Sequence, residues 1–477
     1  MKTGVFPKVS DTIVDKSRTR EAPDERIIRT GWRVCFRRAI MWAKRQRCPT
    51  DGDGQCIYGH DNDRDIYKFR TLAEDYDKRR FMKRQKSNMA LLCGAAAIIL
   101  GAFIILLTDG SQGKVSQIVI GTYGEHIYTY SFDHRQNKFE FQNKTEAHNA
   151  SYALADRIQD GRTGIYAVSE CGENSGVYSF EMNENIAQTG HKQQTGADPC
   201  FVLLYDEGKY MMTADYSGGS VSAFPIVDGA VDDLCASLKF EGRGPVIGRQ
   251  ESSHIHQLKE LPSQSGKWIL ASDLGADVIR LVGIQSNEPA ESAGEDKETT
   301  ISLYHIQDIP CPSGSGPRHM EFNQEYTKLY CIGEISGEVL VYDICHDGDV
   351  PAFTLKQQIQ ADEVNAEGSA DIHIHPSGRW LYTSHRLKND GIAAFHIFPD
   401  GTLKKMDYTI TGRHPRNFMI TDDGEYLLVA CRDDKCVQVF QILPTGRLAQ
   451  TSTTLHFDED KPVCVTLIPN PVLQALK

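Results

Sequence analysis

The chain has 477 residues, of which 40% are hydrophobic and 24% charged, and its formal net charge is −12 at pH 7. Its 13 cysteines do not form a disulfide framework, since four come at or before residue 93 and the remaining nine are an odd number. The sequence contains no Cys-x-x-Cys zinc spacing, no Gly-x-Ser-x-Gly elbow and no phosphate-binding P-loop. It therefore gives no support for a zinc module, a covalent serine hydrolase or a nucleotide hydrolase.

The first 88 residues are basic, whereas the rest of the chain is acidic. Residues 1–88 carry 22 Lys and Arg against 13 Asp and Glu, a net charge of +9, and residues 89–477 carry 30 against 51, a net charge of −21. Residues 31–47 mix aromatic side chains with arginine, which is typical of a helix on an anionic membrane or of a disordered basic tail. We predict a basic, mostly disordered tail over residues 1–88. No nucleic-acid partner is expected, because a predicted membrane span follows.

Residues 89–107 contain no charged or strongly polar side chain, and 19 such residues are long enough for one transmembrane helix. A buried core helix is the alternative; a cleaved signal is not expected, because its apolar region would be shorter and nearer the amino terminus. Six Lys and Arg residues lie within residues 78–86, and positive flanks stay cytoplasmic. We therefore predict a single-pass membrane protein with a span over residues 89–108, a cytoplasmic amino terminus and a lumenal or extracellular C-terminal domain.

The remainder of the chain repeats a pattern of strands, seen most clearly in residues 316–344, 370–397 and 414–442. Strands of the type Val-x-Val-Tyr begin at residues 127, 177, 221, 278, 339, 392 and 437, at intervals of 44 to 61 residues. Seven copies of about four strands each predict an all-β, seven-bladed β-propeller over residues 115–477, with two β-sandwiches as the alternative. We expect an exposed insertion at residues 285–300, and a strand at residues 463–468 that pairs with the first blade and closes the ring.

Two features bear on the compartment of this domain. Asn143 and Asn149 begin glycosylation sequons, so a glycoprotein is expected if the domain enters a secretory lumen. Cys431 and Cys436 bracket a four-residue turn and could face each other across a hairpin, although unpaired buried thiols are equally compatible with the sequence.

Polar residues recur at equivalent points of the copies, and in a propeller such residues converge on the mouth of the central channel. Arginines suit carboxylate or phosphate, and histidine or a buried glutamate can transfer protons. A small anionic substrate is therefore expected. The polar residues at the starts of copies are His254, His256, Arg318, His319, Arg416 and Asn417, and those assigned to the ends of third strands are Glu170, Asp273, Glu334, His385 and Arg386.

Each of these residues also has a purely structural interpretation. An arginine can pair with a carboxylate of the neighbouring blade, and a buried glutamate can satisfy backbone amides. The pairs His254 and His256, and His373 and His375, have a spacing that could hold a metal, but no third ligand is evident. We predict no metal site and no cofactor.

Several segments resemble the lactonase-type seven-bladed propeller family, which includes 6-phosphogluconolactonases and 3-carboxy-cis,cis-muconate cyclases. The resemblance covers residues 115–470 and rests on the combination of DLGADVIR and GSGPRH, with HIHQL, SHR and PRNF elsewhere. One departure is LKELPSQSGK at residues 258–267, where the family has an apolar-Asp-Pro-x-Gly turn, which puts the local strand geometry in doubt. The tail and the predicted span have no counterpart in the soluble members.

The resemblance implies an enzyme, either a cycloisomerase or a lactone hydrolase, that forms or opens a lactone ring without a cofactor. The implied catalytic residues are His256, Arg318, Glu334 and Arg386, with Arg416 competing for the role of Arg386 and His254 for that of His256. The implied substrate-binding residues are His254, Arg416, Asn417 and Glu170. A non-catalytic, ligand-binding or protein-binding ectodomain is the alternative, and the propeller is expected to be monomeric.

Overall fold

The computed structural model describes residues 114–158, 161–182, 186–192, 196–262, 266–287 and 300–469. The predicted basic tail, the predicted span and most of the predicted insertion lie outside these residues. Among the residues described, no helix is both long and apolar enough to cross a bilayer. The predictions about the membrane therefore stay predictions.

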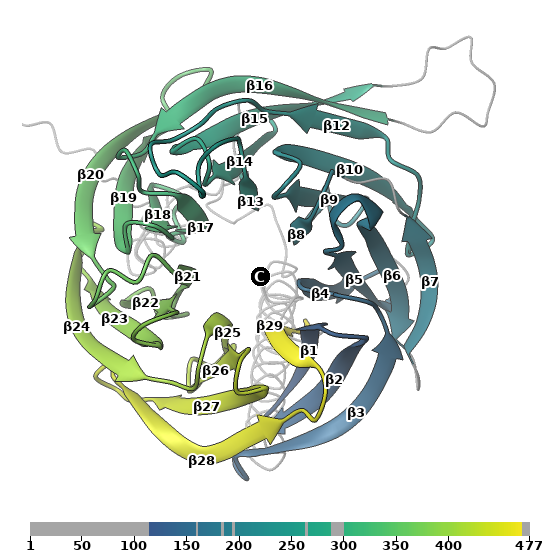
Figure 1. Ribbon diagram of the computed structural model, residues 1–477, viewed down its shortest axis with the longest axis vertical. Coiled ribbons are helices and arrows are strands. Elements are labelled where there is room, and N and C mark those ends of the chain that lie inside the picture. Colours follow the sequence, from purple (N-terminus) through teal and green to yellow (C-terminus); the bar gives the residue numbers. More distant parts are fainter. Residues whose placement is uncertain are drawn as a thin grey trace, which may run out of the picture. The chain divides into compact units, whose positions relative to one another are not determined.

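The described residues form seven antiparallel sheets arranged around one axis, which confirms the seven-bladed propeller (Figure 1). From the axis outward, blade 1 contains β29 (Lys461–Leu467), β1 (Val115–Tyr123), β2 (His126–Asp133) and β3 (Lys138–Glu146). Blade 2 contains β4 (Ala153–Arg157), β5 (Thr163–Ser169), β6 (Gly176–Met182) and β7 (Ile186–Lys192), with the short 3-10 helix η1 (Gly172–Asn174) between β5 and β6. Blade 3 contains β8 (Pro199–Tyr205), β9 (Tyr210–Asp215), β10 (Ser220–Val227), β11 (Ala230–Val231) and β12 (Ala236–Lys239).

The other four blades are regular. Blade 4 contains β13 (Ile255–Leu261), β14 (Trp268–Asp273), β15 (Val278–Asn287) and β16 (Thr300–Pro310). Blade 5 contains β17 (Pro317–Phe322), β18 (Lys328–Gly333), β19 (Glu338–Cys345) and β20 (Ala352–Gln360). Blade 6 contains β21 (Ser369–Ile374), β22 (Trp380–His385), β23 (Gly391–Ile397) and β24 (Leu403–Ile410). Blade 7 contains β25 (Pro415–Ile420), β26 (Tyr426–Cys431), β27 (Cys436–Ile442) and β28 (Leu448–His456).

One detail of the predicted strand order is wrong. The polar residues assigned to third-strand ends instead end or follow the second strands β5, β14, β18 and β22, because the third strands from the axis are the Val-x-Val-Tyr strands themselves. The outermost strands carry little of the repeat because they alternate between half-buried and exposed positions, as β20 does. The second strands are buried on both faces, as β14 and β22 are, so their apolar runs dominate the pattern.

The ring closes as predicted, because the C-terminal strand β29 pairs with β1 in blade 1. Ile118 is opposite Leu467 and Ile120 is opposite Val465 in this antiparallel register. The pairing joins the two ends of the propeller and removes two free sheet edges. The departure from the family pattern at residues 258–267 does not disturb blade 4, where Leu258 pairs with Ala271 in regular register.

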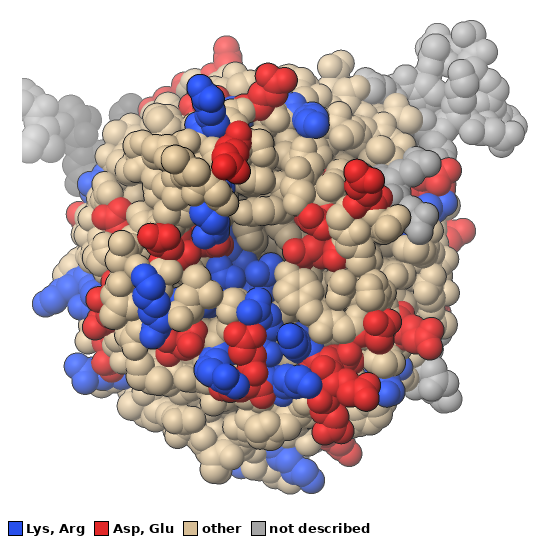
Figure 2. All heavy atoms as spheres, viewed as in Figure 1, with Lys and Arg blue, Asp and Glu red and all other residues tan. Residues whose placement is uncertain are grey.

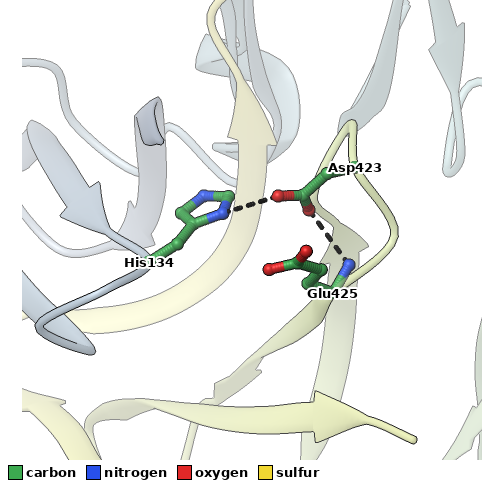
Figure 3. A group of neighbouring side chains, drawn as sticks. All are labelled: His134, Asp423 and Glu425. Atoms are coloured by element: carbon green, nitrogen blue, oxygen red, sulfur yellow. Dashed lines mark hydrogen bonds and ion pairs between the residues drawn. The ribbon is translucent and has the colours of Figure 1, made fainter. Parts of the chain in front are cut away.

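A cluster of polar side chains also joins blades 1 and 7, and it includes His134, Asp423 and Glu425 (Figure 3). Nδ1 of His134 lies 2.8 Å from Oδ2 of Asp423, and its Nε2 lies 2.9 Å from Oγ of Ser116. Nζ of Lys114 lies 3.4 Å from Asp423 and 3.5 Å from Oε1 of Glu425. Both imidazole nitrogens of His134 thus have partners, and the ammonium of Lys114 lies close to the carboxylates of Asp423 and Glu425. We therefore interpret this cluster as a contact that holds the closed ring together rather than as a metal centre.

The core lies between neighbouring blades. One cluster combines Trp380 and Tyr382 of blade 6 with Phe418 and Val429 of blade 7, and the other inter-blade clusters follow the same plan. Cys431 and Cys436 pair directly across the hairpin of blade 7, as expected, and both are buried free thiols.

Candidate active site

The innermost strands of blades 3 to 7 each begin with a β-bulge. The register shifts between Ile255 and Gln257, between Pro317 and His319, and between Pro415 and Asn417, with similar shifts in β8 and β21. Each shift leaves one or two residues outside the regular pairing, and bulges of this kind re-aim side chains next to active sites. The residues placed in this way are Cys200, His256, Arg318, Ala370 with Asp371, and Arg416.

A second set of side chains follows the second strand of each blade, at the same end of the ring. Gly333 pairs with Pro317 and is followed by Glu334, and His385 pairs with Ser369 and is followed by Arg386. Glu170 and Tyr216 follow the second strands of blades 2 and 3 in the same way, and Tyr123 is the last residue of the second strand of blade 1. The propeller therefore brings most of the predicted site residues to one end of the ring, together with two tyrosines that the sequence analysis did not predict.

Glu334 is at the centre of the site. Its Oε2 lies 2.7 Å from Nε of Arg318 and 3.0 Å from Nη2 of Arg386, and its Oε1 accepts a hydrogen bond of 2.5 Å from Nη2 of Arg249. Burial alone would raise the pKa of Glu334, but the guanidinium groups of Arg386, Arg318 and Arg249 hold it at about 2. A carboxylate that is ionised and paired on both oxygens is a poor base. Glu334 is therefore better suited to hold the arginines in place than to transfer a proton, the role that the sequence analysis considered for it.

The two deepest arginines are fixed by the backbone as well. Nη1 of Arg318 donates to the carbonyl oxygen of Ala370 at 2.6 Å, and Nε of Arg386 donates to that of Gly368 at 2.8 Å. Their side chains are only 2% and 6% exposed. Burial lowers the pKa of both guanidinium groups, and Glu334 opposes this effect. The charge of each arginine therefore depends on the carboxylate that they share.

Arg416, which competes with Arg386 in the sequence analysis, belongs to a neighbouring group. Its Nη2 lies 4.0 Å from Oε2 of Glu170, and its guanidinium carbon lies 5.3 Å from the centroid of the Tyr123 ring. The Tyr123 hydroxyl donates to Oε2 of Glu170 at 2.9 Å. Arg386 is thus the partner of Glu334, whereas Arg416 forms a second cationic position with Glu170 and Tyr123.

His256 is buried beside Arg318 as a neutral imidazole. Burial, together with the positive charge of Arg318, lowers its pKa well below the usual value. Its Nδ1 lies 3.7 Å from Sγ of Cys200, and its ring meets the ring of His319 edge to face at 5.2 Å. Its Nε2 makes no hydrogen bond to the part of the chain that the structure describes. With the ring proton on Nδ1, which faces Sγ of Cys200, Nε2 has a free lone pair that can accept a hydrogen bond or a proton.

Two predicted substrate-binding residues have other contacts. The His254 ring stacks on Tyr216 at 4.4 Å between centroids and its Nδ1 lies 2.9 Å from the Tyr216 carbonyl oxygen, so it supports the site from behind that tyrosine. Asn417 donates to Oδ2 of Asp371 at 2.6 Å and accepts from the backbone N–H of Val465 at 2.7 Å. Asn417 consequently ties blades 6, 7 and 1 together, because it follows the bulged Arg416 and points in another direction.

The motif DLGADVIR supports the site rather than lining it. Asp277 accepts hydrogen bonds from the backbone N–H groups of Gly314 (2.6 Å) and Gly316 (2.8 Å), and so holds the segment before Arg318. Asp273 accepts from the N–H of His254 at 2.8 Å and pairs with Arg280 at 2.8 Å. The two motif segments are thus linked through carboxylates that fix the approach to both inner strands.

The site has an excess of positive charge. Four guanidinium groups (Arg249, Arg318, Arg386, Arg416) surround two carboxylates (Glu170, Glu334). Figure 2 shows basic side chains gathered in and around the hollow at the centre of the ring. Such a concave positive region attracts small anions.

A separate cavity of about 360 Å³ lies between blades 2 and 3, at the end of the strands opposite the site. Its walls include Asp156, Arg157, Tyr166, Lys209 and Asp228, and it contains none of the predicted site residues.

Comparison with known proteins identifies relatives over nearly the whole propeller. The family model described as "Lactonase, 7-bladed beta-propeller" matches residues 117–467. The 6-phosphogluconolactonase of Formosa agariphila is 28% identical over 340 residues, which are 68% of this chain and 91% of that protein. The 6-phosphogluconolactonase of Bacillus subtilis is 26% identical, over 73% of this chain and 97% of that protein. A Bacteroides fragilis protein described as a candidate 6-phosphogluconolactonase is 35% identical, with a TM-score of 0.65, over 74% of this chain and 98% of that structure.

Proposed function

Because the chain belongs to the seven-bladed β-propeller lactonase family, we propose that it hydrolyses a small anionic lactone at the site around Arg318 and Glu334. Several of its relatives bear the name 6-phosphogluconolactonase, and the chain is an enzyme of their family. The observation that carries the proposal is the contact of Glu334 with three guanidinium groups, those of Arg318, Arg386 and Arg249, at the same end of the ring as the buried imidazole of His256. This arrangement supplies cations for an anionic substrate and an acceptor for a proton.

In the proposed reaction, the arginines bind the negative charges of the substrate. Arg318 and Arg416, which come from equivalent bulges, are the groups that we expect next to the lactone carbonyl. Nε2 of His256 accepts a proton from the attacking water as its oxygen bonds to the carbonyl carbon. The guanidinium groups stabilise the tetrahedral oxyanion. The ring C–O bond then breaks, and the imidazolium returns its proton to the leaving oxygen, which gives the open hydroxy acid.

The proposed role of Glu334 is to hold the arginines in place without neutralising the site. One carboxylate serves three guanidinium groups, so positive charge remains for the substrate and for the developing oxyanion. Glu170 and Tyr123 serve Arg416 in the same manner.

The cyclase reaction is the second chemistry that these residues could perform, since arginines that bind carboxylates can also stabilise the enolate formed when a carboxylate adds to a double bond. We place hydrolysis first because the relatives found are named as lactone hydrolases. Product analysis of the purified chain incubated with 6-phosphogluconolactone, 3-carboxymuconolactone and 3-carboxy-cis,cis-muconate distinguishes the two. We expect hydroxy acid from a lactone. Turnover of muconate alone would establish the cyclase, and binding without turnover would establish the non-catalytic ectodomain.

We further propose that residues 89–108 anchor the enzyme in a membrane with the propeller on the lumenal or extracellular side. The charge-free run and the preceding basic residues support this arrangement. Expression in a eukaryotic secretory cell, followed by glycosidase treatment, tests it. The protein should lose mass on deglycosylation, and the double variant N143Q/N149Q should not. A wild-type propeller that protease digests from the cytosolic side of sealed microsomes would contradict the orientation.

A further inference from the structure

The connection between blades 3 and 4 carries a site residue that the strand repeat does not predict. This connection, residues 240–254, joins β12 to β13. From it, Arg249 donates through Nη2 to Oε1 of Glu334 in blade 5. Its Nη1 donates at 3.4 Å to the carbonyl oxygen of Glu367, which lies between blades 5 and 6. Arg249 therefore links the connection between blades 3 and 4 to blade 5 and to the segment between blades 5 and 6.

Arg249 is the outermost of the three guanidinium groups on Glu334. Its side chain is 31% exposed, whereas those of Arg318 and Arg386 are 2% and 6% exposed. Burial opposes its charged form, but Glu334 raises the pKa of Arg249, and the Tyr216 hydroxyl lies within hydrogen-bonding reach. An anion that enters the hollow thus meets Arg249 before it meets the buried arginines.

The connection is held in place relative to β17, the strand that carries Arg318. Nε2 of Gln250, a residue only 1% exposed, donates to Oδ1 of Asp277 at 2.7 Å and to the carbonyl oxygen of Leu274 at 2.8 Å. Oδ1 of Asp277 also accepts from the N–H of Gly316, two residues before Arg318. A single carboxylate therefore holds the residue next to Arg249 and the segment that leads to Arg318, which sets the spacing between the two guanidinium groups.

We propose that Arg249 is a specificity-determining residue that binds the anionic substituent of the substrate, a phosphate or carboxylate remote from the lactone carbonyl. A guanidinium has five N–H donors, and those not directed at Glu334, Glu367 and Tyr216 remain for the ligand. Arg318 and Arg386 are less suited to this remote group, because they are only 2% and 6% exposed and each donates a hydrogen bond to a backbone carbonyl oxygen deeper in the site. This inference rests on the proposed lactone hydrolysis.

The test compares an anionic lactone, 6-phosphogluconolactone, with the uncharged glucono-1,5-lactone. The full-length variants are R249A, R249K and, as the matched control, R243A, which removes an exposed arginine of the same connection. Loss of a charge-assisted hydrogen bond predicts that R249A raises KM for the anionic lactone roughly 10- to 100-fold. We expect kcat to change by less than about threefold, kcat/KM for the uncharged lactone to change far less, R249K to be intermediate, and R243A to match the wild type.

A second measurement keeps the inference separate from the proposed reaction. Calorimetry with 6-phosphogluconate and with gluconate should show that the wild type prefers the phosphorylated ligand and that R249A loses most of this preference. A wild type that hydrolyses neither lactone would refute the proposed function, while the binding measurement would still test Arg249. An R249A variant that loses activity equally on both lactones, or keeps the binding preference, would overturn the inference and leave Arg249 with a structural role.

Discussion

Nε of Arg318 lies 2.7 Å from Oε2 of Glu334, and the two residues reach this position from adjacent strands of one blade. Arg318 is the bulged residue of β17, and Glu334 follows the end of β18, its antiparallel neighbour. The pair is therefore assembled within blade 5, and Arg386 and Arg249 approach it from either side. The electrostatics of the site depend on this shared carboxylate, which leads to the first prediction.

Replacing Glu334 with glutamine should remove a pH-dependent contribution to stability. The pKa of Glu334 is about 2 in the folded protein against an ordinary value of 4.5, so its ionised form stabilises the fold above pH 4.5. That stabilisation is lost as the pH falls from 4.5 through 2, and it amounts to about 3 kcal/mol. Urea unfolding at several pH values measures the difference between wild type and E334Q.

The difference in unfolding free energy should be largest near neutral pH and should shrink toward pH 2. The control is E325Q, which neutralises an exposed glutamate of the same blade and should stay within about 0.5 kcal/mol of the wild type. A difference between wild type and E334Q that does not vary with pH would contradict the ion cluster.

The neutral state of His256 predicts the shape of the pH–rate profile. Because burial and Arg318 lower its pKa well below 6.5, the acidic limb of kcat/KM should lie below pH 6.5, with no loss of activity between pH 6.5 and 7.5. H256N should lower kcat by roughly 10²- to 10⁴-fold and remove that limb.

H254N is the matched control for this experiment, since His254 stacks on Tyr216 and should influence the rate far less. Steady-state rates, corrected for spontaneous lactone opening at each pH, provide the measurement. An acidic limb with an apparent pKa at or above 6.5 that persists in H256N would assign the base elsewhere.

The contact between blades 1 and 7 should contribute to stability without affecting catalysis. D423N removes the carboxylate that joins His134 and Lys114, and the loss of these charged hydrogen bonds should cost about 1–3 kcal/mol of unfolding free energy. D422N changes an exposed neighbouring aspartate and should stay within about 0.5 kcal/mol of the wild type. Equal melting temperatures of the two variants would show that β29–β1 pairing alone closes the ring.

The fold was largely predictable because each blade repeats the same buried strands. The seven Val-x-Val-Tyr segments gave the number of blades, and the surplus strand at residues 463–468 gave the closure that β29 and β1 make. The position of these strands within each blade was not predictable in the same way. The outer strands share little sequence beyond alternation, so they do not appear as part of the repeat.

The site was predictable where function follows the repeat. Arg318 and Glu334 lie at points of the repeat where other blades also carry polar residues, so the symmetry of the ring alone indicates that these side chains converge. Arg249 lies in an irregular connection with no counterpart, and only the folded chain brings it to Glu334. Asn417 is the opposite case: the repeat predicts it as a site residue beside Arg416, but its side chain forms hydrogen bonds with Asp371 and Val465 instead.

The most direct test of the account compares hydrolysis of 6-phosphogluconolactone by the wild type, R318A and R379A. Arg379 lies on the turn between β21 and β22, at the other end of the ring, and serves as the matched control. Removal of an oxyanion-stabilising group predicts a loss of roughly 10²- to 10³-fold in kcat for R318A and no loss for R379A. A folded R318A that hydrolyses the lactone as fast as the wild type would contradict the assignment of the active site.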